Sequence, residues 1–106
     1  MANVLINAPK SAKRGSVVEI KALILHPMES GFRPGPTGKP IPRNIVENFT
    51  ATWNGTEIFR MEMSPAIAAN PFVSFFAVAT ESGNIGFRWT GDEGFLVEEQ
   101  VAIAVE

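Results

Sequence analysis

The sequence predicts an all-β domain in which two antiparallel sheets pack face to face. Apolar side chains recur at every second position rather than at the spacing of a helix. The runs that carry them are rich in Val, Ile and Phe, and clusters of Gly, Pro, Asn and Asp separate one run from the next. With 106 residues, the chain fits one compact unit, so a single domain over residues 1–106 is expected.

Two strands are expected in the first quarter of the chain. The first begins at Val4 and ends at Pro9, before a polar turn. The second covers residues 17–25, where Glu19 and Lys21 point away from the apolar side chains because successive strand positions face opposite sides. The apolar face of this second strand is expected to carry Val18, Ile20, Ala22 and Ile24.

A hairpin is expected between residues 45–53 and 58–63, because an Asn-Gly pair follows the first run. A two-residue loop would place Phe59 and Met61 on the face away from Phe49. A three-residue loop changes this parity and brings the three side chains to one face, as a buried face requires. We therefore predict a turn with a bulge in place of the simple two-residue loop.

Three more strands complete the predicted sandwich. Residues 72–79 are almost wholly apolar, as expected of a central strand, and a crossing loop at 64–71 precedes them. Ile, Phe and Trp alternate with Gly and Arg over 85–89, and a final strand covers 97–105. About seven strands at regular spacing predict an antiparallel sandwich of the immunoglobulin-like type, with a closed small β-barrel as the alternative. The side chains expected to be buried include Ile20, Phe49, Phe76, Phe87 and Val101.

Residues 26–44 interrupt the strand pattern and hold five prolines and three glycines. Loops of this length are uncommon inside compact domains and are usually functional or disordered, so a contact surface for a partner is expected here. Phe32 supplies an apolar ring with no expected place in the core, and Met28 supplies a flexible apolar contact. Arg43 can pair with carboxylates of a partner. The predicted partner-binding residues are His26, Met28, Phe32 and Arg43.

His26 is the only imidazole, so one chain cannot build a catalytic triad or a multi-histidine metal centre around it. Pairing with Glu29 as a base, or with Met28 as ligands of copper(I), is a weaker interpretation than hydrogen bonding that anchors the loop. A second interpretation stays open for His26 and Met28, in which both side chains pack the loop onto its own sandwich.

Composition excludes several function classes. The chain has no Cys, which removes thiol catalysis, thiolate zinc sites and iron–sulfur ligation, so we expect no enzyme activity, no metal and no cofactor. A formal net charge of −2 and a pI near 5.4 argue against nucleic acid as a partner. The opening residues lack a basic leader and a long apolar run, so neither a signal peptide nor a membrane span is expected.

The His-Pro-Met-Glu sequence at 26–29 and the Ala-Asn-Pro-Phe sequence at 69–72, with further stretches in the same order, resemble the SoxZ family of sulfur-oxidation proteins. These two motifs carry the most specific part of the resemblance, which runs from about Ala8 to the C-terminus. The stretches that match in order are 21–31, 39–46, 54–59, 69–76, 81–83 and 89–92.

The resemblance implies a non-catalytic scaffold subunit that pairs with SoxY, whose C-terminal Gly-Gly-Cys-Gly-Gly arm carries covalently bound sulfur intermediates during thiosulfate oxidation. It also implies a heterodimer or a higher assembly, transient contacts with other sulfur-oxidation enzymes, and a periplasmic location reached by export together with the partner. No motif identifies which sheet face binds that partner. The alternatives are a generic immunoglobulin-like binding module for protein or carbohydrate, and a small metal or redox domain.

Overall fold

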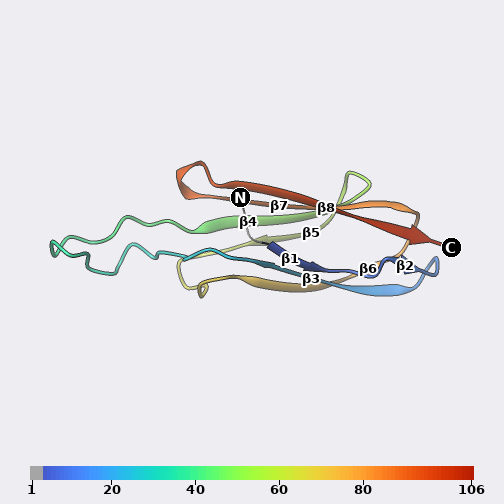
Figure 1. Cartoon of the computed structure of the whole chain (residues 1–106), viewed down its shortest axis with the longest axis horizontal. Helices are drawn as coiled ribbons and strands as arrows, with labels where there is room; N and C mark the ends of the chain where they lie inside the picture. The colour runs from blue at the N-terminus through green and yellow to red at the C-terminus, as the bar shows by residue number, and fades with distance from the viewer. Residues whose placement is uncertain (1–3) are drawn as a thin grey trace.

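The computed structural model describes residues 4–106, which form strands joined by turns and one short 3-10 segment (Figure 1). The elements are β1 (Val4–Asn7), β2 (Ser11–Ala12), β3 (Val17–Ile24), β4 (Val46–Trp53), β5 (Thr56–Glu62), β6 (Phe72–Val78), β7 (Gly83–Gly91), η1 (Asp92–Gly94) and β8 (Leu96–Val105).

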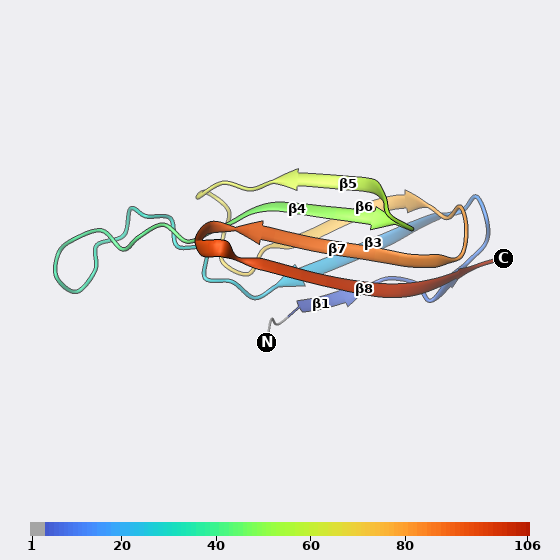
Figure 2. The ribbon, with the colours of Figure 1, turned by 90° about the horizontal axis from the view of Figure 1, so that it is seen from above.

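The strands form two sheets that lie face to face as two layers (Figures 1 and 2). One sheet has the order β1-β3-β6, and the other has the order β2-β8-β7-β4-β5. Neighbouring strands are antiparallel except for the two-residue β2, which runs parallel to the end of β8. The prediction of an all-β antiparallel sandwich is therefore confirmed, with β2 as a short addition to the strands expected.

Aromatic rings from both sheets fill the core between the layers. Trp89, Phe49 and Phe87 are the largest side chains that are fully buried. The ring of Phe49 lies 5.1 Å from that of Trp89 in its own sheet and 6.1 Å from that of Phe75 in the other sheet, measured between centroids. Such tilted aromatic pairs stabilise the core beyond the effect of the apolar area that they bury. The inward face of β3 holds the four side chains that its alternation predicted.

The prediction for β6 was wrong in two respects. This strand is an edge strand that pairs only with β3, and its outward residue Phe76 is 66% exposed while its neighbour Phe75 is buried. Apolar side chains occupy both faces of β6, so the continuous apolar run resembled a central strand although only one face is covered. Val101, also expected in the core, is partly buried.

The hairpin between β4 and β5 has the expected face but not the expected loop. Trp53 pairs with Thr56, so the loop has two residues, and both of them have positive φ as a type I′ turn requires. A bulge then shifts the register, because Ala51 pairs with Phe59 whereas Thr52 pairs with Glu57. The bulge in the strand, rather than a longer loop, brings Phe59 to the side of the core.

Phe75 and Phe76 offer a direct test of which face of β6 is buried. We expect Phe75→Ala to lower the free energy of unfolding by about 3–5 kcal/mol, because it leaves a cavity beside Phe49 and Phe59. Phe76→Ala should change it by less than about 1 kcal/mol, since its ring is mostly in solvent. Urea unfolding of both variants measures the difference, and equal losses would contradict this orientation of β6.

Candidate functional site

Residues 26–44 project from one end of the sandwich as a narrow arm (Figures 1 and 2). The molecule measures 58 Å along its long axis but only 21 and 19 Å across it. The arm is a two-sided ribbon rather than the structureless loop that its composition suggested. Glu29 and Asn44 exchange two backbone hydrogen bonds of 2.8 Å, and Ile41 donates to the carbonyl of Arg33. Because proline lacks an N–H, the prolines keep the ladder between the two sides discontinuous.

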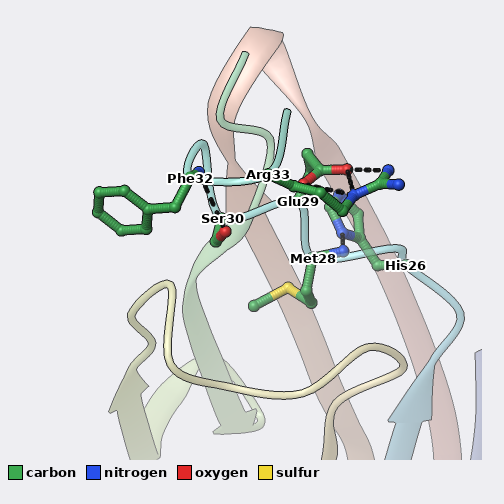
Figure 3. Close-up of polar contacts among 6 residues, drawn as sticks. All are labelled: His26, Met28, Glu29, Ser30, Phe32 and Arg33. Atoms are coloured by element: carbon green, nitrogen blue, oxygen red, sulfur yellow. Dashed lines mark hydrogen bonds and ion pairs between the residues drawn. The ribbon is translucent and has the colours of Figure 1, made fainter. Parts of the chain in front are cut away.

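His26 fixes the base of the arm to the sandwich (Figure 3). Its side chain is buried, and its Nδ1 accepts a hydrogen bond of 2.9 Å from the backbone N–H of Met28. The backbone of His26 accepts from the N–H of Asn70 and donates to the Oδ1 of the same residue. The imidazole also lies edge-on to Phe95, with ring centroids 4.8 Å apart. These contacts agree with an anchoring role, which the sequence favoured over acid–base chemistry.

Burial lowers the pKa of His26 below its usual value of 6.5, because the charged imidazolium would lose its hydration. A hydrogen bond with the side chain of Asn44 and the negative charge of Asp92 act in the opposite direction but are weaker. The neutral ring also keeps the lone pair that accepts from Met28. The geometry of the arm base therefore depends on an uncharged His26.

Met28 fills the space between the arm and β4. Its side chain is buried, and its Sδ accepts a hydrogen bond of 3.2 Å from the backbone N–H of Val46. The residue has φ of 52°, in the left-handed region that is uncommon for a side chain of this kind. The unbranched thioether therefore serves both as an apolar filler and as an acceptor for the first amide of β4.

Arg43 belongs to a group of charged side chains at the arm base. Its guanidinium donates to Asp92 over 2.8 Å and to Glu47 over 3.4 Å. The other oxygen of Asp92 accepts from the backbone N–H of Ile45, and the guanidinium of Arg43 holds the pKa of this carboxyl below its usual range. Asp92 thus ties the turn between β7 and β8 to the arm.

Phe32 is the apolar contact residue that the chain leaves in solvent, whereas the exposed guanidinium of Arg43 is paired with carboxylates. Its ring is 84% exposed and points away from His26 and Met28 (Figure 3). The backbone around it is ordered, because the N–H of Phe32 donates to Ser30 and Arg33 forms an ion pair of 2.6 Å with Glu29. The chain therefore holds an exposed aromatic ring in a defined place on the arm.

The four predicted site residues fall into two groups in the isolated chain. Phe32 is displayed on the arm, whereas the other three contact the arm base. Asn70 and Asp92 also hold this base, although neither was among the predicted site residues. Their partners lie more than forty positions away along the chain, so no local pattern could reveal them.

Acidification should loosen the arm base through His26. Because the pKa of His26 is lower in the folded state than in the unfolded state, its contribution to stability is complete above pH 6.5 and is lost as the pH falls toward the folded pKa. We expect the free energy of unfolding to decrease between about pH 7 and about pH 5, above the range in which carboxyl groups titrate.

His26→Asn is the matched control, because an Asn oxygen can accept from the N–H two residues on but does not titrate in this range. Urea unfolding across the pH series should give a flatter profile for His26→Asn than for the natural chain. Parallel profiles would assign the pH dependence to other groups.

Solved structures with this fold come from several protein classes. Superoxide reductase (neelaredoxin) from Ignicoccus hospitalis is 18% identical, with a TM-score of 0.76 over 99% of this chain and 82% of that chain. The sulfur carrier protein SoxY from Chlorobium limicola is 15% identical, with a TM-score of 0.69 over 97% of this chain and 78% of that chain. A CARDB domain from Pyrococcus furiosus is 14% identical, with a TM-score of 0.54 over 100% of this chain and 94% of that one. At these identities the likeness shows the fold alone.

The remaining comparisons concern sequence. A search of the curated proteins gives no match. Within residues 4–106, no helix is long and apolar enough to cross a membrane. The family described as sulphur oxidation protein SoxZ matches residues 6–102, which is nearly the whole chain. The chain therefore belongs to the SoxZ family and has a role in sulfur oxidation.

Proposed function

We propose that this chain is the non-catalytic subunit of a sulfur-carrier complex, in which it pairs with a SoxY-type subunit whose cysteine carries the sulfur. The observation that supports the proposal most directly is the family match over residues 6–102 in a chain without cysteine. Covalent sulfur transfer needs a thiolate, so that chemistry must lie on another subunit. The role left to this chain is to hold and present the partner.

The residues of this chain offer little for bond making. The Nδ1 of His26, the only imidazole, already accepts a backbone hydrogen bond, and the ring is buried. Within the described part of the chain, no group of three or more His, Asp or Glu side chains is arranged to hold a metal ion. These features support a scaffold better than an active site.

The arm supplies one part of the proposed contact with the partner. Phe32 presents an exposed ring on an ordered ribbon, so little conformational freedom is lost when the ring docks. His26, Met28 and Arg43 act in this proposal by fixing the direction of the arm. The arm also provides a surface for transient contacts with other sulfur-oxidation enzymes. We place the complex in the periplasm, in line with the family resemblance, with export as a passenger of the partner.

The division of chemistry between the subunits can be tested by mass spectrometry. The chain is incubated with its SoxY-type partner, thiosulfate and the remaining sulfur-oxidising enzymes. We expect a sulfur adduct on the cysteine of the partner and none on this chain, because it offers no thiolate. Omitting this chain should lower turnover. A covalent sulfur adduct on this chain would contradict the proposed scaffold role.

The contact role of Phe32 predicts a loss of affinity without a loss of stability. Phe32→Ala should weaken binding of the SoxY-type partner by at least about 1 kcal/mol, roughly fivefold in Kd, and leave Tm unchanged. Isothermal titration calorimetry measures the affinity and differential scanning calorimetry measures Tm. Leu96→Ala is the control, since this exposed apolar side chain lies outside the arm. An unchanged Kd for Phe32→Ala would remove this ring from the interface.

A further inference from the structure

The outer faces of the two sheets differ in chemistry. On the five-stranded sheet, Thr50 of β4 lies between Arg60 of β5 and Arg88 of β7, and Arg88 is opposite Glu98 of β8. The next row places Thr52 of β4 beside the exposed Glu57 of β5. Threonines and charged side chains therefore cover this outer face, as expected of a face that stays in water.

The outer face of the three-stranded sheet is largely apolar instead. Leu5, Leu23 and Phe72 form one row across β1, β3 and β6, and Val17 lies beside Val78 at the other end. Phe76 projects between these two rows from β6. We name this surface the apolar face, and its residues are Leu5, Val17, Leu23, Phe72, Phe76 and Val78.

The apolar face gathers most of the exposed apolar side chains of the described residues. Five of the eight large hydrophobic side chains that are exposed lie on it, with Leu5 71% and Phe72 57% exposed. A shallow hollow of about 270 Å³ opens between Leu5, Leu23 and Phe72. In Figure 1 this sheet is the lower layer, and no other described segment crosses its outer side. Exposed apolar side chains gathered on one face in this way mark an interaction site.

One charged pair interrupts the apolar face at its centre. Lys21 Nζ lies 3.8 Å from Glu19 on β3, and Ser74 on β6 donates to the same carboxylate over 3.0 Å. Both charged side chains are 44% exposed, so a partner can reach them. A negative and a positive side chain next to each other favour one orientation of the partner, in which charges of opposite sign on the partner lie against them.

From these observations we propose that the apolar face is the main binding surface for the partner. The partner in this proposal is a second antiparallel sandwich that packs one of its sheets against the face. This inference rests on the proposed pairing with a SoxY-type subunit. SoxY from Chlorobium limicola has the same fold as this chain, so a partner of this type has a sheet face that could pack against the apolar face. Sheets that pack face to face keep their strands within about 30° of each other, which places the partner's strands along β3.

The size of the apolar face indicates that a partner bound there also contacts the base of the arm. With a rise of about 3.3 Å per residue and about 4.8 Å between strands, three strands of this length cover a flat area of at most roughly 400 Å². A stable interface buries about 800 Å² of accessible surface on each partner, so a footprint of this size favours a further contact beyond the face. Leu25 follows β3 directly, is exposed and leads into the arm. A partner aligned with β3 therefore gains the missing area from the base of the arm.

Calorimetric titration with the SoxY-type partner tests whether the apolar face is the binding surface. The double variant Phe72→Ser with Phe76→Ser should bind at least about 100-fold more weakly, because both rings are exposed and would be central to the contact. Leu96→Ser, on the outer side of the five-stranded sheet, is the control and should stay within about twofold of the natural chain. Urea unfolding verifies that both variants keep the fold.

A second measurement uses the natural chain. Lysine acetylation followed by mass spectrometry should show Lys21 protected in the complex and Lys13, an exposed residue outside the sheets, labelled as in the free chain. Two results would overturn the assignment of the face but not the pairing. In the first, the double variant binds the partner as tightly as the natural chain does. In the second, Lys21 stays labelled although the natural chain binds the partner. Natural chain that fails to bind would overturn the pairing itself. If the natural chain self-associates and the double variant does not, the face binds a second copy of this chain instead.

Discussion

The packing of Phe49 between the two sheets is the contact on which the rest of the structure depends. Its ring meets Trp89 within its own sheet and Phe75 from the opposite sheet, so it fixes which side of β4 and β6 faces inward. That choice leaves Phe76 on the outer side of β6. The aromatic core thus determines the outer surfaces as well as the interior, because every inward residue of a strand commits its neighbours to the outside.

The same arrangement explains why the arm needs anchors from several parts of the chain. One side of the arm continues from β3 and the other leads into β4, and these strands belong to opposite sheets. The base of the arm therefore spans the gap between the layers. Asn70 holds it from the segment before β6, and Asp92 holds it from the turn after β7. These contacts fix the base of the arm to the sandwich, while the backbone hydrogen bonds between Glu29 and Asn44 hold its two sides together.

Sequence periodicity predicted the strands well but could not always say which side is buried. Alternation identified the inward residues of β3, because its other face carries Glu19 and Lys21. It failed for β6, where apolar side chains on both faces remove the contrast that the argument requires. The charged neighbours were thus as informative as the apolar ones. The sequence also identified His26 and Met28 as notable, although only the structure shows Met28 hydrogen-bonded to His26 and to Val46.

The chemistry of the arm base makes it more sensitive to mild acid than the sandwich that carries it. The core consists of apolar side chains that do not titrate, apart from the buried His26 at its margin. The carboxyl pKa values of Glu29 and Asp92 are lowered by Arg33 and Arg43, so acid weakens these two ion pairs only below the ordinary carboxyl range. Protonation of His26 would remove the acceptor for the N–H of Met28 and place a positive charge in a site that is shielded from water. Acidification therefore acts on the direction of the arm before it acts on the sheets, and a partner that contacts both surfaces would lose the arm first.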